Sequence, residues 1–516
     1  MSTEPLLSPG VGGEAKKKKK KGTRLGIDDA LSMHAGEFGR WQLRHFVLVS
    51  AAWALEALHT MVIIFADREP AMVCGASGGC GDRCAGAAAG WEWADGAASS
   101  TVAEWGLVCG ERYKVGLAQA VFFAGCMIGA GVFGHLSDSF LGRKGSLQVV
   151  CVLNAAFGLL TALSPNYWAY AALRLLTGFS TGSVGVLAFV LATEPIGPSR
   201  RGAAGMSTFY FFSGGIAALA GVAALFPRSW RMLYVVTSLP SLAFVVAVVP
   251  FVSESPRWYL VRRRTDDAMR IVRAIAATNG RSVPEDVTLK LDDEDGEGEN
   301  AVDDSANSSS SSGSIVDVFR SRTTRVRLVL SVLINLLTSV VYYGLSLNVV
   351  NLKTNLYVSV VVNSLAEMPA YLLTALLLDR FGRKPLAIGT MLLSGVFCTA
   401  GSLIAGEGIM RVVRMACGVV GIFGMAATYN LLFIYTAELF PTVVRNAALG
   451  CTAQAAQMGA IVAPLVVVLG ERMPFAVFGA SGIVGVLLVV YLPETMNKPL
   501  YDTMAGLEEG EKSLLK

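Results

Sequence analysis

Gly134-x-x-x-Asp138-x-x-x-Gly142-Arg143-Lys144 and Asp379-x-x-Gly382-Arg383-Lys384 are the two stretches of this sequence that decide its fold. Each is a charged turn that follows one long apolar segment and precedes another. Other landmarks recur with nearly the same offset: Arg174-x-x-x-Gly178 returns as Arg414-x-x-x-Gly418, and Glu194 with Arg201 returns as Glu438 with Arg445. The chain therefore contains an internal duplication, and membrane proteins built from repeats commonly place a substrate site where the repeats meet. The first turn holds one extra residue before its second glycine, so its geometry is not predicted.

The composition indicates what surrounds these turns. Hydrophobic residues make up 53% of the 516-residue chain and charged residues 16%, whereas a soluble domain carries about 25% charged residues. An apolar run of about 20 residues spans the hydrocarbon core of a bilayer, and twelve such runs occur, six in each half. The sequence predicts an all-α membrane protein with twelve transmembrane helices in two pseudo-symmetric six-helix bundles, over residues 45–66, 115–137, 147–163, 167–191, 202–226, 231–252, 328–350, 354–378, 385–405, 412–436, 446–470 and 474–492.

The distribution of basic residues predicts the orientation. Most of the 43 Lys and Arg residues fall in segments that are cytoplasmic if the N-terminus is inside, as the positive-inside rule requires. Both termini are then cytoplasmic, with a basic tail at 1–44 and a second tail at 493–516 flanking the bundles at 45–252 and 328–492. No cleavable signal is evident. We interpret the Lys16 to Lys21 run as a solvated arm rather than a nucleic-acid-binding site.

Two long segments interrupt the apolar pattern. Residues 67–112, on the predicted outer side, hold four of the nine cysteines: Cys74, Cys80, Cys84 and Cys109. This favours two disulfides, with three possible connectivities, over free thiols or a metal site, because zinc-type spacing is absent. Residues 253–327 begin with basic, helix-compatible sequence and then become acidic and serine-rich. We interpret them as a flexible cytoplasmic linker that is disordered near 292–314.

The sequence lacks the motifs of ATP-driven pumps and metallohydrolases. It contains neither a phosphate-binding loop nor His-Glu-x-x-His, so we expect no enzyme activity, no cofactor and no metal. Glu56 and Glu367 lie near the middle of the first and eighth spans, and ionisable groups in a bilayer usually face a cavity or a partner. Two such carboxyls favour a cation or a proton over an anion. Each could instead stay protonated against a neighbouring helix, and His59 is the candidate partner of Glu56.

Several motifs together resemble the major facilitator superfamily and, within it, the organic cation transporter family. The duplicated Asp...Gly-Arg-Lys turns are similar to the signature loops of the superfamily. Three further stretches narrow the resemblance to the organic cation transporters, and in particular to their plant organic cation/carnitine members, over about residues 38 to 500. These are Glu254-Ser255-Pro256-Arg257-Trp258, Ala437-Glu438-Leu439-Phe440-Pro441-Thr442-x-x-Arg445-Asn446 and Glu104-Trp105-Gly106-Leu107-Val108-Cys109.

The resemblance implies transport by alternating access, in which the two bundles rock about a central site. It implies that ion pairs of the charged turns close the cytoplasmic gate, through Asp138, Arg143, Glu194 and Arg201 in one half and Asp379, Arg383, Glu438 and Arg445 in the other. Family positions for substrate match Tyr342, Glu367, Tyr429 and Asn430, to which we add Glu56. Gln457 stands where cation-selective animal members carry an aspartate, so it can hydrogen-bond substrate but contributes no charge.

The leading interpretation is a secondary active or facilitative transporter of small organic cations or zwitterions, of the carnitine, polyamine or quaternary ammonium class. A proton-coupled sugar or other neutral-solute porter is the alternative, because Arg174-x-x-x-Gly178 and the Ser-Pro-Arg segment occur widely in the superfamily. A nontransporting membrane sensor and an anion carrier are the remaining alternative functions. Expected partners are the substrate, a coupling proton or sodium ion, and the lipid bilayer. The vacuolar and plasma membranes are both candidate locations, since Glu4-Pro5-Leu6-Leu7 only weakly matches a dileucine sorting signal.

Overall fold

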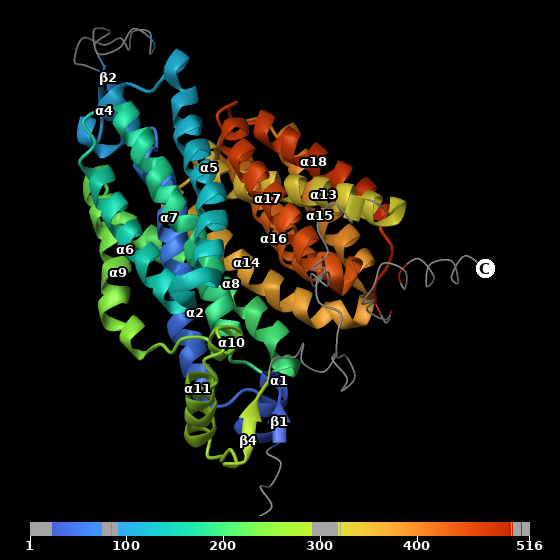
Figure 1. Ribbon diagram of the computed structural model, residues 1–516. Helices are drawn as coiled ribbons and strands as arrows, with labels where there is room; N and C mark the ends of the chain where they lie inside the picture. Colours follow the sequence, from blue (N-terminus) through green and yellow to red (C-terminus); the bar gives the residue numbers. More distant parts are fainter. Residues whose placement is uncertain are drawn as a thin grey trace, which may run out of the picture.

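The computed structural model describes residues 23–74, 84, 91–290, 318–319, 321–496, 498 and 507. Within these residues, twelve helices of 18 to 31 residues form two groups of six (Figure 1). The first group is α2 (Arg40–Met61), α5 (Tyr113–Leu136), α6 (Gly142–Ala162), α7 (Tyr167–Thr193), α8 (Pro198–Leu225) and α9 (Trp230–Ala247). The second is α13 (Arg322–Leu347), α14 (Leu356–Phe381), α15 (Arg383–Leu403), α16 (Ile409–Leu439), α17 (Thr442–Val467) and α18 (Met473–Val490). Short helices α3 (Ile63–Ala66), η6 (Val249–Phe251) and η8 (Asn348–Leu352) follow α2, α9 and α13.

Eleven stretches of the described residues are long and apolar enough to cross a membrane. One of them, Cys109–Ala162, has 54 residues and contains both α5 and α6. At 1.5 Å per residue this stretch would measure about 80 Å as one helix, more than twice the roughly 30 Å of the hydrocarbon core. Counting its two helices separately gives twelve spans. The all-α membrane fold predicted from the sequence is confirmed.

The extra residue of the first charged turn lies in a π-helical turn, η5 (Ser137–Leu141), which continues α5 as far as Gly142. A π-helical turn takes up one residue more than an α-helical turn. In the second half, α14 ends at Phe381 and Gly382 follows directly. Gly142 and Gly382 have φ angles of 76° and 90° and ψ angles of 174° and 168°, a region open essentially only to glycine. The two turns therefore change direction in the same way despite their different lengths.

The two halves repeat one packing pattern. In the first half, α5 packs on α7, α6 on α9 and α2 on α8. The equivalent contacts in the second half are α14 on α16, α15 on α18 and α13 on α17. Contacts between the halves are paired as well, because α5 packs on α17 and α8 packs on α14. One apolar core cluster extends across this boundary, and one further cluster lies inside each half.

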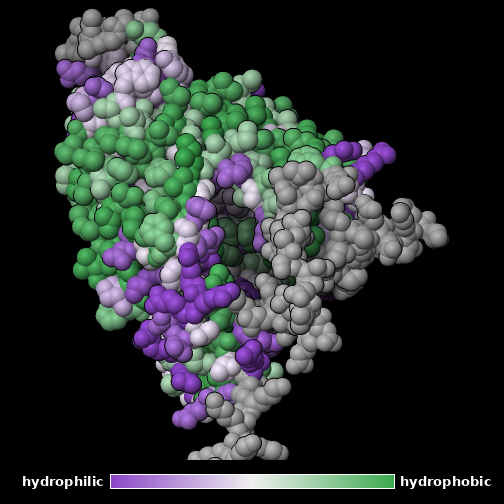
Figure 2. Space-filling view, viewed as in Figure 1, coloured by the Kyte–Doolittle hydropathy of each residue, from purple (hydrophilic) through white to green (hydrophobic). Residues whose placement is uncertain are grey.

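The helix ends lie at two faces, which we name by what they carry. The charged-turn face carries the turns at Gly142 and Gly382 together with α10 (Pro256–Val261) and α11 (Thr265–Thr278). The loop face carries the chain between α3 and α5 (Figure 1). Hydrophilic residues gather at the charged-turn end of the first half, and a broad hydrophobic surface lies between the two faces (Figure 2). This surface is what a bilayer would cover.

A small folded unit, the N-terminal clasp, lies on the charged-turn face. In it, β1 (Thr23–Leu25) pairs in parallel with β4 (Val287–Leu289), while α1 (Ile27–Ala30) and the π-helical η1 (Leu31–Ala35) share an apolar core with α11. The apolar residues of α11 recur every three to four positions, as in an amphipathic helix. The interpretation of 253–327 as a flexible linker is therefore wrong for its first part, because α11 has an apolar partner. The stretch 292–314 lies outside the described residues.

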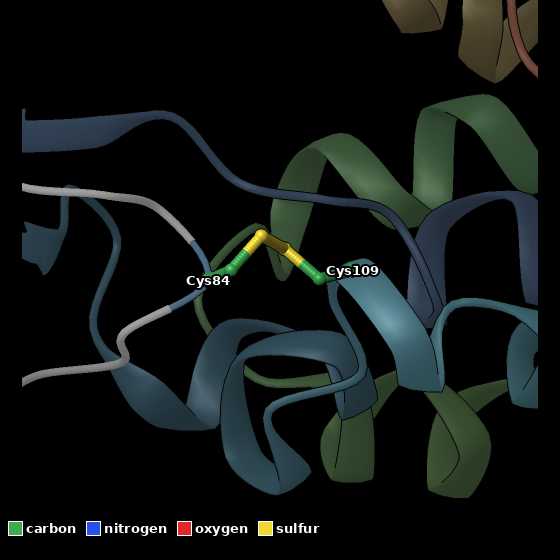
Figure 3. The surroundings of a disulfide bond; sticks show 2 residues. All are labelled: Cys84 and Cys109. Atoms are coloured by element: carbon green, nitrogen blue, oxygen red, sulfur yellow. A yellow bond between two sulfur atoms is a disulfide. The ribbon is translucent and has the colours of Figure 1, made fainter.

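The loop face carries a short hairpin and several single helical turns. β2 (Met72–Cys74) pairs with β3 (Trp91–Trp93) in antiparallel fashion, and η3 (Ala97–Ser99), α4 (Thr101–Trp105) and η4 (Cys109–Glu111) follow. Cys84 and Cys109 form a disulfide with 5.8 Å between their Cα atoms (Figure 3). Cys74 is also disulfide-bonded, and Cys80 lies outside the described residues. The Trp105 ring packs against Trp230, with 5.3 Å between centroids.

Candidate functional site

A cavity of about 210 Å³ lies between the two halves. Helices α2, α7 and α8 line it from the first half, and α13, α16 and α17 line it from the second. Lining residues Thr436, Leu449 and Thr452 lie in the parts of their helices nearer the charged turns. The cavity therefore extends from the middle of the molecule toward the charged-turn face. Figure 2 shows a deep recess between the two halves.

Aromatic side chains form much of the cavity wall. The Tyr342 ring stacks on Tyr429, with 5.1 Å between centroids and 27° between planes, and Tyr343 meets Tyr429 edge-on at 6.4 Å. In the first half, the Trp53 and Phe209 rings lie 5.3 Å apart. The aromatic lining residues are Trp53, Phe209, Phe212, Tyr342, Tyr343, Tyr429 and Phe433. The face of an aromatic ring attracts a cation through the ring quadrupole.

Glu56 is the one charged residue among the described side chains that line this cavity. Its Oε2 is buried and has no hydrogen-bond partner among the described groups. A Cβ atom at Gly185 of α7 would collide with this oxygen, so the glycine makes room for the carboxylate. The alternative in which His59 is the partner of Glu56 is not seen, because both His59 ring nitrogens are buried without hydrogen bonds to described atoms. A carboxylate with one buried, unpartnered oxygen in an aromatic cavity suits a cationic ligand.

Glu367 lies behind the cavity wall rather than in the cavity. Its side chain is only 1% exposed, and its Oε2 accepts hydrogen bonds from the hydroxyls of Ser213 (2.6 Å), Tyr371 (3.0 Å) and Tyr342 (3.2 Å). Ser213 belongs to α8 of the first half, whereas both tyrosines belong to the second. The Glu367 carboxylate therefore links the two halves at mid-height. The Tyr342 ring lines the cavity while its hydroxyl holds this carboxylate.

Of the remaining predicted substrate residues, some line the cavity, as Glu56 does, and one is buried away from it, as Glu367 is. Tyr429 and Gln457 line the cavity, as Tyr342 does. Asn430 is 1% exposed and does not appear on the cavity wall, and its Nδ2 has no hydrogen-bond partner among the described atoms. Four of the six predicted residues thus surround one space, whereas Glu367 and Asn430 are buried outside it.

The charged turn of the first half is held together by side chains of that half. Arg143 forms ion pairs with Asp138 and, at 3.4 Å, with Glu194. The carboxylate of Glu254, from the segment after α9, accepts hydrogen bonds from the backbone N–H groups of Arg143 (3.0 Å) and Lys144 (3.1 Å). It therefore caps the first turn of α6. Burial raises the pKa of Glu254, and these backbone hydrogen bonds only partly offset the effect.

The second half repeats this arrangement. Arg383 pairs with Glu438 at 2.9 Å, and Glu494 accepts hydrogen bonds from the backbone N–H groups of Arg383 (3.0 Å) and Lys384 (2.9 Å). Burial alone would raise the pKa of Glu494, but hydrogen bonds from four backbone N–H groups hold it below its ordinary value. Nε and Nη2 of Arg445 are buried without a hydrogen-bond partner among the described residues. The side chain of Asp379 lies outside the described part of the structure.

Arg201 does not pair with Glu194, although the two recur together in the sequence. It pairs instead with Asp28 of the N-terminal clasp at 2.6 Å, and Arg257 pairs with the same carboxylate. Burial alone would raise the pKa of Asp28, but the two arginines hold it below its ordinary value. Where both partners are described, every ion pair joins groups of the same half. In this structure the two charged turns are therefore not tied to each other by a described ion pair.

Comparison with known proteins places this architecture in a family. The family model described as "Sugar (and other) transporter" matches residues 92–505. The chain belongs to this family. Two relatives from Arabidopsis thaliana agree with it: organic cation/carnitine transporter 4, 63% identical over 96% of this chain and 94% of its own length, and organic cation/carnitine transporter 2, 34% identical over 93% of each. The resemblance to the organic cation transporters is confirmed, as is the prediction of a transporter rather than an enzyme.

Solved structures with the same architecture confirm the major facilitator fold. The chain aligns with the xylose transporter XylE from E. coli in an inward open conformation, with a TM-score of 0.64 and 18% sequence identity over 91% of this chain and 99% of XylE. A partially occluded inward open structure of XylE aligns with a TM-score of 0.62 and 17% identity. At such identity the likeness is one of fold.

Some lining residues of this transporter were not predicted. Trp53 and Tyr343 both face the cavity, and neither carries the charge that marked Glu56 and Glu367 in the sequence. A usable signal existed, because Trp53 lies three positions before Glu56 on the same helix, and Tyr343 adjoins Tyr342. The capping role of Glu254 and Glu494 was also not predicted.

Proposed function

We propose that this protein transports small organic cations, including zwitterions with a quaternary ammonium group, by alternating access between its two halves. The observation that carries the proposal is the cavity in which seven lining residues are aromatic and Glu56 is the one charged described residue. A quaternary ammonium donates no N–H hydrogen bond, so its recognition depends on carboxylate charge and on aromatic faces. The Arabidopsis relative named organic cation/carnitine transporter 4, at 63% identity, supports this substrate class.

The second-half wall of the cavity suits the other end of a zwitterion. Asn335 and Gln457 line it and offer amide N–H donors. Glu56 lies on the first-half wall, so a carnitine-like molecule would span the cavity with its ammonium group toward Glu56 and its carboxylate toward these donors. A simple cation would use only the first of these contacts.

We assign the charged-turn face to the cytoplasm. Basic residues predominate there, as the positive-inside rule requires, and the Cys84–Cys109 disulfide on the opposite face fits an oxidising compartment. Both termini are then cytoplasmic, and the vacuolar and plasma membranes are the two candidate locations. A proton or a sodium ion remains the candidate coupling ion.

We infer that the described arrangement is the state that faces the cytoplasm. On the loop face the halves touch, since Arg112 donates a hydrogen bond to Asn351 at 3.2 Å and the Phe65 ring stacks on Tyr357 at 5.4 Å. On the other face the described ion pairs stay within each half. In the opposite state the two charged turns would approach each other. We propose that Asp138, Arg143, Glu194, Arg201, Asp379, Arg383, Glu438 and Arg445 then close the cytoplasmic gate.

Uptake into vesicles tests the proposed cargo. Purified full-length protein in liposomes is expected to accumulate labelled tetraethylammonium or carnitine above empty liposomes, and an imposed pH gradient reports whether protons are coupled. Putrescine tests the polyamine class, and glucose is the neutral control. Uptake of glucose without uptake of any cation would instead establish a neutral-solute porter, and saturable binding of a cation without flux would establish a sensor.

The Ser213→Ala variant is expected to weaken the loop-face-closed state. The Ser213 hydroxyl donates to Glu367 across the boundary between the halves, and a hydrogen bond to a charged group contributes about 1.5–3 kcal/mol. Loss of the lower figure would raise the population of the other state about tenfold. A cysteine placed at Val115 on the loop face should then react about tenfold faster with an impermeant thiol reagent.

Ser207→Ala is the matched control for this measurement. Ser207 lies on the same helix, and its hydroxyl bonds only the carbonyl of Ala203 one turn away. This variant should leave the labelling rate at Val115 unchanged. Equal labelling rates in Ser213→Ala and in the parent protein would show that the Ser213–Glu367 bond does not hold the halves together.

A further inference from the structure

Asp67 is a buried carboxylate at the loop face, and only one of its two oxygens has hydrogen-bond partners among the described groups. It follows α3, is 6% exposed, and accepts hydrogen bonds at Oδ1 from the hydroxyls of Thr101 (2.7 Å) and Tyr170 (2.8 Å). Tyr170 in turn shares a hydrogen bond of 2.8 Å with Tyr234. Oδ2 of Asp67 is buried and has no partner among the described groups. An unpaired charged oxygen in such a place is costly.

The unpaired side of Asp67 lies where the two halves meet. Asp67 lines a pocket of about 50 Å³ between α3 and α5 of the first half and α13, η8 and α17 of the second. All described lining side chains from the second half are apolar: Leu347, Val350, Pro464, Val467 and Val468. At the same boundary Gly116 lies so close to the carbonyl oxygen of Pro464 that a Cβ would come within 2.8 Å of it. Closure of the loop face thus removes water from Asp67 and supplies no polar side chain in return.

Among the described residues, the charged and titratable groups that act on Asp67 come from the first half. Tyr170 and Tyr234 form the hydroxyl chain described above, and Tyr167 lies on the same helix as Tyr170. Arg174, also on α7, directs its guanidinium to Gln119 (2.6 Å) and to the carbonyl of His59 (3.1 Å) rather than to Asp67. Burial raises the pKa of Asp67 to about 6, an effect that the hydrogen bonds from Thr101 and Tyr170 and the charge of Arg174 only partly offset.

We propose that Asp67 is a proton-binding site of the loop-face gate and takes up a proton when that gate closes under acidic conditions. When the halves part at this face, water reaches the carboxylate and it ionises as an ordinary aspartate does, near pH 4. In the closed gate the neutral acid is favoured, because the ionised form has an unpaired buried oxygen. By linkage, acid must in turn favour closure. The closed-to-open ratio rises up to about tenfold per pH unit between pH 6 and pH 4, and stays constant above pH 6, where Asp67 is ionised in both states.

A distance measurement tests this site without reference to cargo. Spin labels carried by non-natural amino acids at Tyr113 and Leu469, both exposed at the loop face on opposite halves, report the opening of the gate in full-length protein in nanodiscs. Between pH 7.5 and pH 5.0 the closed-to-open ratio of the parent protein is expected to rise about tenfold. Asp67→Asn, which cannot ionise, should remain at the acidic ratio at both pH values. Asp95→Asn is the matched control, because Asp95 lies on the same face, paired with Arg68, and this variant should keep the full shift.

A second variant keeps the proposal testable if Asp67→Asn does not fold. Thr101→Val is nearly isosteric and removes one donor to the carboxylate, so the midpoint of the pH-dependent shift should move up by about one unit. A shift of parental size in Asp67→Asn, or an unchanged midpoint in Thr101→Val, would overturn the proposal. Since the readout is a distance, it stands or falls separately from the proposed cargo, which the uptake measurements decide.

Discussion

Replacing Glu56 with glutamine is expected to lower the kcat/KM of cation uptake by about 30-fold or more. Removal of one partner from a buried charge pair costs about 2–5 kcal/mol, and about 2 kcal/mol corresponds to a 30-fold change. Glutamine keeps the shape of glutamate and leaves the fit against Gly185 intact, so the effect isolates the charge. Initial rates of tetraethylammonium uptake into proteoliposomes, at matched protein density, measure it.

Two further substitutions test whether the loss of uptake is specific to a carboxylate that lines the cavity. Glu407→Gln removes an exposed carboxylate that pairs with Arg411 outside the cavity, so its uptake should equal that of the parent protein. Glu367→Gln should change the rate of interconversion between states more than it changes cation affinity, because Glu367 lies behind Tyr342. Parental uptake kinetics in Glu56→Gln would remove Glu56 from the substrate site.

Replacing Gly382 with alanine is expected to lower the thermal stability of the protein by several degrees. The backbone conformation of Gly382 costs a residue with a side chain about 1–3 kcal/mol. In addition, the new Cβ would lie 2.8 Å from Oε2 of Glu494, displacing the carboxylate that caps α15. The fraction of monodisperse protein that remains after heating, measured by size-exclusion chromatography, reports the change. Gly142→Ala should act in the same way in the first half, through Glu254.

Gly389→Ala is the matched control for this turn. Gly389 lies within α15, and an added Cβ there meets no atom within 4 Å. Alanine is favoured over glycine inside a helix by about 1 kcal/mol, so this variant should be as stable as the parent protein or slightly more stable. If Gly382→Ala melted at the temperature of Gly389→Ala, the turn would not depend on glycine.

Features with a local or repeated signal were predictable. The spans follow from apolar runs of sufficient length, and the two halves follow from the recurrence of the charged turns. The depth of Glu56 and Glu367 was also predictable, since position along a helix fixes depth. Which way each helix faces was not. Rotation of α14 about its axis directs Glu367 toward Ser213 of α8 and away from the cavity, and this rotation depends on packing between residues 154 positions apart.

Features that need a distant partner were missed. The segment with α11 looked like part of a linker, because its apolar stripe has no partner nearby in the sequence. Its apolar partner is the stretch from Ile27 to Ala35, and Asp28 of that stretch also forms an ion pair with Arg201. The pairing of Arg201 with Asp28 could not be predicted from the recurrence of Glu194 and Arg201, because the carboxylate comes from a segment far away in the sequence.

The pairing of β1 with β4 fixes where the connection between the halves begins. Leu25 accepts a hydrogen bond from the backbone N–H of Lys290 at 3.0 Å, so the first half extends at least to Lys290 rather than ending near Ser253. A split version of the protein, expressed as two polypeptides, should accordingly be cut after Lys290. A cut near Ser253 would assign β4 and α11 to the wrong fragment and separate them from the N-terminal strand that completes them.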